Sequence, residues 1–163
     1  MDNELNVKEV AFNNVTQWLK DYGFKIKTET RNKTGGSEIQ FQANVYPANQ
    51  ERLFFMIVFS NRFKDSFNIG STISLPEEVS KTIDTGMIRK EQEQVYIDIY
   101  RLVFSQGLDC DTRFPMIDIH KLIFIDTLKD KQYFFDSVFN LIHAMILVEG
   151  RFDELINRFF PKE

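Results

Sequence analysis

The chain has 163 residues, of which 43% are apolar and 27% are charged. This composition is typical of one ordinary globular domain and excludes a fibrous or disordered chain. Its 20 basic and 24 acidic side chains leave a net charge of -4, which disfavours a protein that is attracted as a whole to nucleic acid or to an anionic membrane.

The chain has too few cysteines and histidines for a fold held together by disulfides or by a Cys/His metal site. The single cysteine, Cys110, cannot form a disulfide within the chain, and His120 and His143 cannot complete a Cys/His zinc site. We therefore expect no metal or other cofactor. The charged N-terminus lacks the apolar segment of a signal peptide, and the apolar run at residues 53–59 is far shorter than the ~20 residues that a membrane helix needs. These features predict a cytoplasmic protein with no membrane partner.

The first predicted element is an amphipathic helix from about Val7 to Tyr22. Asn6 and Glu9 resemble a capping box at its start, and Gly23 is typical of a left-handed helix stop. Apolar residues at spacings of three and four are expected to share the buried face. These residues are Val7, Val10, Ala11, Val15, Trp18, Leu19 and Tyr22.

Four antiparallel strands are expected next. Alternation over residues 24–31 and again over 39–45 predicts a hairpin with its turn at 33–37. The continuous apolar run at 53–59 predicts a central strand that is covered on both faces. Alternation resumes at 67–75, where Gly70 is typical of a bulge.

A second helix is expected after Ser74 and Pro76, interrupted near Gly86 and ending at Gly107. Residues 109–114 and 115–128 then have an extended pattern. The apolar residues of the second segment change parity near His120, which leaves open one bulged strand or two strands over Pro115–Leu128.

The last predicted element is a long helix from Asp130 to Phe160, with a kink at Gly150. Between Tyr133 and Val148 it is apolar nearly all round, so it should be buried nearly all round. The order α-β-β-β(-β)-α-β(-β)-α predicts an α+β fold in which helices pack on an antiparallel sheet of about five strands. We expect one domain, residues 1–163, with its core at about 7–160.

Catalytic motifs are weak. Asp136, Asn140 and His143 share one line of the last helix, and an Asp with a His can act as an acid/base pair. No nucleophile, metal partner or phosphate loop accompanies them, so a solvent-facing line is the favoured interpretation. Gly35 and Gly36 lack the following GK[ST] of a phosphate loop and suit a hairpin turn.

Two further features have ordinary explanations. Cys110 lies between Asp109 and Asp111, whose charges raise the pKa of the thiol and argue against a reactive cysteine. One strand face carries basic side chains without interleaved stacking aromatics, which makes nucleic-acid binding a minor alternative. Its residues are Lys25, Lys27, Arg31 and Lys33.

The feature that favours a function is a surplus of apolar helix surface at residues 95–104 and 133–148. One sheet can cover only one side of these helices, so the remainder should meet a second copy or a client peptide. A large core in an ordinary monomer is the competing interpretation. The candidate interface residues are Val95, Ile99, Val103, Phe139, Ile142 and Ile146.

The element order, the Tyr22-Gly23-Phe24 helix end and the Ser74-Leu75-Pro76-Glu77 junction resemble the type III secretion chaperone-like fold that YbjN-type proteins share. The layout also resembles small uncharacterised archaeal proteins. The resemblance implies an acidic, non-enzymatic homodimer that binds protein segments through apolar patches. A secretion role is not carried over, because residues 61–75 and the last helix do not match.

The sequence therefore predicts a non-enzymatic, homodimeric protein-interaction or chaperone-like module that binds a protein or peptide. One alternative is an enzyme or small-molecule binder with a pocket between the sheet and the last helix, anchored by Asp136 and His143. The other is a weak nucleic-acid binder that uses the strand face from Lys25 to Lys33.

Overall fold

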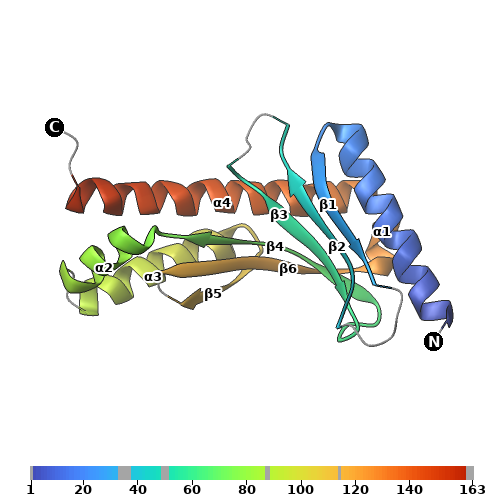
Figure 1. The fold of residues 1–163 in the computed structure, drawn as a ribbon, viewed down its shortest axis with the longest axis horizontal. Coiled ribbons are helices and arrows are strands. Elements are labelled where there is room, and N and C mark those ends of the chain that lie inside the picture. Colours follow the sequence, from blue (N-terminus) through green and yellow to red (C-terminus); the bar gives the residue numbers. More distant parts are fainter. Residues whose placement is uncertain (1, 33–37, 49–51, 87–88, 114, 161–163) are drawn as a thin grey trace. The chain divides into compact units, whose positions relative to one another are not determined.

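The computed structural model describes residues 2–32, 38–48, 52–86, 89–113 and 115–160 (Figure 1). Over these residues the helices are α1 (Asp2–Tyr22), α2 (Glu77–Gly86), α3 (Arg89–Ser105) and α4 (Lys131–Phe159), with a short 3-10 helix, η1 (Ile125–Lys129). The strands are β1 (Lys25–Arg31), β2 (Ile39–Tyr46), β3 (Phe55–Ser60), β4 (Ser66–Ser74), β5 (Asp109–Arg113) and β6 (Met116–Phe124).

The chain divides into two compact units. The first comprises residues 1–70 and 121–138, and the second comprises 71–120 and 139–163. Each unit is built from two separate chain segments, and β4, β6 and α4 contribute residues to both. The prediction of one domain is not tested by this division and stays a prediction.

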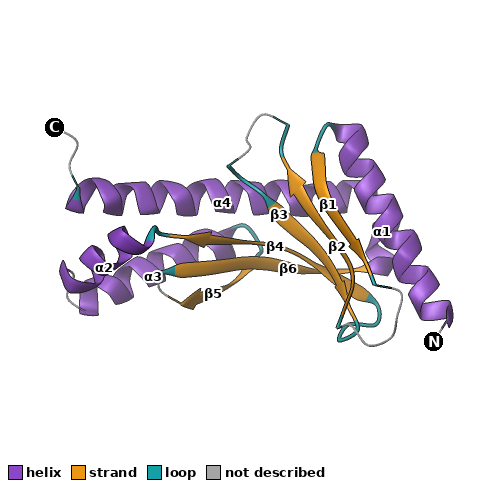
Figure 2. Cartoon of the chain, viewed as in Figure 1, coloured by secondary structure: helices purple, strands orange, loops and turns teal. Residues whose placement is uncertain are grey.

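The strands are hydrogen-bonded in the order β1-β2-β3-β4-β6-β5 (Figure 2). The pairs β1/β2, β2/β3, β3/β4 and β5/β6 are antiparallel. The α+β class is thus confirmed, with six strands over the described residues rather than about five. The predicted hairpin is confirmed by the β1/β2 pairing, although its turn at 33–37 lies outside the described residues.

Phenylalanine forms the core of the first unit. The rings of Phe12 and Phe41 stack at 5.4 Å, and those of Phe59 and Phe67 stack at 4.4 Å. The ring of Phe67 also lies near that of Phe134 at the start of α4, with the two centroids 6.4 Å apart. All five are fully buried, so these phenylalanines, out of 17 in the chain, are ordinary core residues.

The buried face of α1 differs from the predicted one. Val7, Val10 and Tyr22 are half or more exposed, whereas Phe12 is fully buried. Lys8 also occupies a core position, because its aliphatic stem is buried while its Nζ donates a hydrogen bond to the carbonyl of Ser60 at 3.0 Å. The buried stripe is Lys8, Ala11, Phe12, Val15, Thr16 and Leu19.

The end of α1 is as predicted. Gly23 adopts a φ of 101°, in the left-handed region that favours glycine, and β1 begins two residues later. Gly107, with a φ of 68°, follows α3 in the same way.

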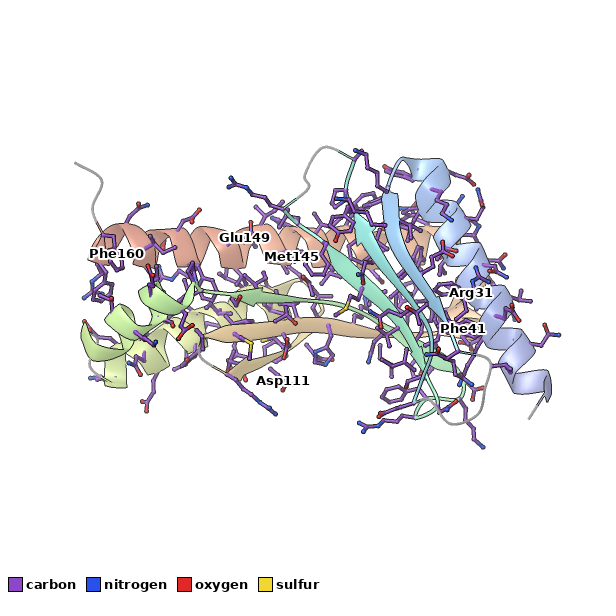
Figure 3. All side chains as sticks on the ribbon, viewed as in Figure 1. Arg31, Phe41, Asp111, Met145, Glu149 and Phe160 are labelled. Atoms are coloured by element: carbon purple, nitrogen blue, oxygen red, sulfur yellow. The ribbon has the colours of Figure 1, made fainter. Side chains whose placement is uncertain are left out.

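A bulge in β1 separates the basic residues that the sequence placed on one face. The register shifts between Ile26 and Thr28, so residues after Lys27 change sides. Lys27 lies over the ring of Tyr46 at 4.3 Å. Arg31 instead turns toward α1, where its guanidinium lies 5.2 Å from the ring of Phe12 (Figure 3).

Two expectations for β3 and β4 are also wrong. Met56 and Val58 are half-buried, so β3 alternates and is not covered on both faces. The β3/β4 register is even from Val58 opposite Asn68 to Met56 opposite Gly70, and burial alternates along β4 on both sides of Gly70, so the expected bulge is absent there.

Strand β6 is continuous from Met116 to Phe124, which settles the choice between one strand and two. The expected change of parity at His120 does not occur. Ile117, Ile119 and Ile123 are all buried and share one parity, while Leu122 is half-buried and Phe124 is exposed. Ile123 therefore continues the buried face that Ile117 begins.

In the second unit, α2 ends at Gly86 as predicted. A Cβ at Gly86 would lie 2.8 Å from Cε1 of Phe159, so the absence of a side chain permits this approach.

Helix α4 begins after Asp130, whose Oδ1 accepts a hydrogen bond from the amide of Gln132 at 2.9 Å, and it continues without a break through Gly150.

Candidate functional site

Three polar contacts join α3 and the turn that follows it to α4. Arg158 donates to Glu91 at 3.1 Å and Arg151 donates to Asp98 at 3.0 Å. Just after α3, His143 Nδ1 lies 3.1 Å from Oε1 of Gln106. Along α3 these contacts advance by seven and then eight residues while they retreat by similar steps along α4. The two segments are therefore antiparallel, with one cross-link about every two turns, as the ribbon also shows (Figure 1).

A groove of about 590 Å³ runs between these helices. Its apolar wall contains Leu102, Ile146 and Leu147, and its rim carries charged side chains of both signs. The charged residues that line it are Asp98, Arg101, Arg151 and Glu154. Such a surface combines apolar area with directional polar groups, as protein-binding surfaces do.

Arg151 organises one side of the groove. It reaches Asp98 across the helix pair and Glu154 on the next turn of α4. Its Nε is buried without a hydrogen-bond partner among the described residues. Arg101 differs, because it makes no ion pair with any residue that the structure describes. The groove therefore has one neutralised and one available cation.

Gly150 also lines the groove. It lies within α4, and a Cβ there would meet no atom of the described residues within 4 Å. Glycine in a helix interior is destabilising by about 1 kcal/mol relative to alanine. No close contact within the described part of the chain accounts for a glycine at this position, so the helix backbone is open to approach from outside.

The predicted interface residues fall in three different environments. Ile146 is 45% exposed and lines the groove, and Phe139 is 38% exposed on the same helix. Val95 and Ile142 are half-buried. These four remain candidates for an interface.

Ile99 and Val103 must be removed from that set. Both are fully buried in the second unit, where α3 packs on β5. The sequence placed them on the surface because it could not show which side of the broad apolar face the sheet covers. The covered side of α3 contains both Ile99 and Val103.

Two exposed apolar residues of α3 were not selected from the sequence, Ile97 and Phe104. Ile97 lies outside the buried stripe that contains Ile99 and Val103. An isoleucine outside that stripe was the sequence signal that could have identified it as an exposed apolar residue. Phe104 stacks on Tyr100 with ring centroids 5.6 Å apart.

The proposed acid/base line has local partners. Asp136 is exposed and accepts a hydrogen bond from Gln132 at 2.7 Å, one turn earlier in α4. His143 is exposed and pairs with Gln106, while Asn140 is half-buried. Helical side-chain pairs and a helix-pair cross-link account for these groups without a reaction.

Cys110 is buried on β5. Burial raises the pKa of its thiol to about 11, and the charges of Asp111 and Asp109 add to the effect in that order. The predicted direction of the pKa shift is confirmed, but the neighbouring charges are its weaker cause. A thiol with this pKa is a poor nucleophile near neutral pH.

The basic strand face is not a continuous patch. Arg31 lies near Glu9 and Glu29, which also pairs with Lys20 at 2.9 Å. Both basic partners hold the pKa of Glu29 below its ordinary value, the hydrogen bond from Lys20 having the largest effect. Lys33, Gly35 and Gly36 lie outside the described residues.

Within the described ranges, no group of three or more His, Cys, Asp or Glu side chains could hold a metal ion. None of the helices in these ranges has the length and apolar content that crossing a membrane requires.

The comparisons with known proteins give a family and a fold. No curated protein matches the chain. A crystal structure of an uncharacterized protein from Methanothermobacter thermautotrophicus is similar, with a TM-score of 0.72 and 19% identity over 91% of this chain and 99% of that one. This likeness shows the fold alone, and neither comparison supports the resemblance to type III secretion chaperones. The family model described as "Uncharacterized conserved protein (DUF2299)" matches residues 11–152, so the chain belongs to this family.

Proposed function

We propose that this protein is a non-enzymatic interaction module that pairs with a second copy of itself through the groove between α3 and α4. The observation that carries the proposal is one groove that combines the exposed Ile146 and two half-buried leucines with rim charges of both signs. Ile146 supplies apolar area there, and Arg101 and Glu154 supply opposite charges.

A second copy suits this surface because a twofold axis brings each patch against itself. Arg101 lies on α3 and Glu154 on α4, so a twofold arrangement can place Arg101 of each copy beside Glu154 of the other. One such arrangement makes two equivalent ion pairs. Glu154 is 65% exposed and its present partner, Arg151, keeps Asp98, so Glu154 is able to exchange partners.

Gly150 adds a steric reason. Where a helix carries glycine, another backbone can approach more closely than a side chain would allow. The open space above Gly150 lies in the same groove as Ile146. A helix of a second copy would fill this space and cover the isoleucine.

The test is light scattering coupled to gel filtration over a range of protein concentrations. We expect a dimer that dissociates on dilution, and we expect Ile146→Asp to give a folded monomer. Ile99→Asp is the matched control, because a buried carboxylate at a fully buried position should unfold the chain. A strict monomer at all concentrations, or an Ile146→Asp variant that still dimerises, contradicts the proposal.

A further inference from the structure

The face of the first unit's sheet that carries Gln42 and Val58 holds a row of mostly polar, uncharged side chains. Thr30 lies opposite Gln42, Gln42 opposite Val58, and Val58 opposite Asn68. Because these pairings follow one another across β1, β2, β3 and β4, the four residues form a transverse row on one face of the sheet. This row and the side chains beside it line a pocket of about 500 Å³.

Several polar groups of this pocket have no partner within the described residues. The side chain of Asn68 is half-buried and makes no hydrogen bond there, and the same holds for the exposed hydroxyl of Thr30. Ser60 is only 8% exposed, and its Oγ is buried without a hydrogen-bond partner. Buried polar groups are nearly always satisfied by protein, water or ligand. Of these groups only the Oγ of Ser60 is buried, whereas the amide of Asn68 and the hydroxyl of Thr30 are open to solvent and so available to a bound molecule.

The amide of Gln42 is only weakly held. Its Nε2 lies 3.5 Å from Oδ1 of Asn44, at the long limit for a hydrogen bond to oxygen, and 3.6 Å from Sδ of Met56, which is a weak acceptor. A ligand hydroxyl at an ordinary distance would make a better partner for this amide than either residue.

Asparagine at position 68 is also unusual for its place. It is among the residues depleted in strands, and its strand neighbour Val58 is of the favoured kind. A valine or threonine would suit the strand better at Asn68. Either substitution would remove the side-chain amide and its hydrogen bonds.

The pocket is electrically neutral. No residue of the transverse row is charged, and the two charged side chains at the rim, Glu38 and Arg62, are paired with each other. A neutral ligand is favoured over an ion. Amides and hydroxyls both donate and accept hydrogen bonds, and so do the hydroxyls of a sugar. Phe63 lines the same pocket and is 37% exposed, so it supplies aromatic surface for the apolar side of a pyranose.

We propose that this pocket binds a neutral sugar, with the amides of Asn68 and Gln42 and the hydroxyl of Thr30 meeting the sugar hydroxyls. The volume lies within the range of small-ligand sites, which is about 300–1,000 Å³. The site uses only residues of the first unit and does not depend on self-association through α3 and α4.

The experiment is a titration of the ¹⁵N-labelled full chain, followed by NMR. The probes are methyl α-D-glucopyranoside, methyl α-D-mannopyranoside and N-acetylglucosamine, each up to about 100 mM, with caffeine as a neutral comparison that is not a carbohydrate. We expect saturable shifts with at least one sugar, largest in the backbone and side-chain amides of Asn68 and Gln42. Caffeine should bind more weakly.

Asn68→Val should weaken that sugar at least tenfold without lowering the melting midpoint, because valine suits a strand better. Thr30→Val is a second variant at an exposed position, where loss of fold is not expected, and it should weaken the sugar at least threefold. Asn13→Ala is the matched control, because it removes an exposed amide of α1 outside the pocket lining, and it should change affinity less than twofold.

The proposal is overturned if no sugar gives saturable shifts at that concentration or if caffeine binds more tightly than every sugar. It is also overturned if Thr30→Val and Asn68→Val bind the sugar as the natural chain does.

Discussion

Replacing Gly150 with alanine should stabilise the isolated chain. The position lies inside α4, away from both ends of the helix, and a Cβ there meets no atom of the described residues within 4 Å. The substitution therefore adds helix propensity without a steric cost. Its expected size is about 0.8–1.0 kcal/mol in the free energy of unfolding, which corresponds to a rise of about 2–4 °C in Tm for a chain of this length.

The assay is urea unfolding followed by circular dichroism, at a protein concentration where light scattering gives the monomer mass. The midpoint should rise while the m-value stays constant, since the substitution does not change the surface exposed on unfolding. Gly86→Ala is the comparison, because its Cβ would lie 2.8 Å from Phe159 and force that ring to move. It should gain clearly less than Gly150→Ala or lose stability.

A Gly150→Ala chain that is less stable than the natural one as a monomer would refute the reasoning. Such a result would mean that the backbone at Gly150 is not an open, regular helix. At concentrations that favour the proposed dimer, the same variant should lose part of its gain, because the added methyl group occupies space that the second copy would fill.

Three other substitutions and reactions test local features. Asp130→Ala should cost about 1 kcal/mol by chemical denaturation, since the carboxylate caps the amide of Gln132, whereas Asp130→Asn should cost clearly less. Gly107→Ala should cost about 1–2 kcal/mol because φ is 68°, and an equal loss from Ser105→Ala would contradict this cause. At pH 8 the native thiol of Cys110 should react with a disulfide reagent at least about 100-fold more slowly than in urea, because its pKa is about 11 against an ordinary 9.0. Since the folded pKa is the higher one, the stabilising effect of the neutral thiol is complete below pH 9 and is lost as the pH rises toward 11. A native reaction rate equal to that in urea would show that Cys110 is accessible.

Helix and strand positions were largely predictable because their signals are local. Gly23 and Gly107 ended helices where the sequence placed them, and α4 spans nearly the predicted range. These features depend on backbone freedom and on hydrophobic period, both of which a single sequence carries.

Which side chains of each helix or strand lie on the buried side was less predictable, because it depends on neighbours distant in the sequence. The β1 bulge at Lys27 appears only in the pairing with β2, and it reverses the side on which Arg31 lies. Helix α1 buries Lys8 and exposes Val10, since the carbonyl of Ser60 accepts a hydrogen bond from the lysine. Neither outcome follows from the period of the helix or the strand.

The candidate sites were only partly accessible from sequence. Ile146 was identified by its place on an unusually apolar helix, but Ile99 was assigned to the same surface and is core. The sheet pocket left no local signal, because Thr30, Gln42 and Asn68 come together only through strand register. A candidate site that is assembled by strand pairing cannot be identified from the sequence until that pairing is known.

The most direct test of self-association through α3 and α4 is a charge exchange measured by light scattering. Arg101→Glu and Glu154→Arg should each weaken the dimer, because each places like charges across the twofold axis. The double variant restores opposite charges and should recover dimerisation at least tenfold relative to either single variant. Dimers that persist in both single variants, or a double variant that is weaker than both, would contradict pairing through this groove.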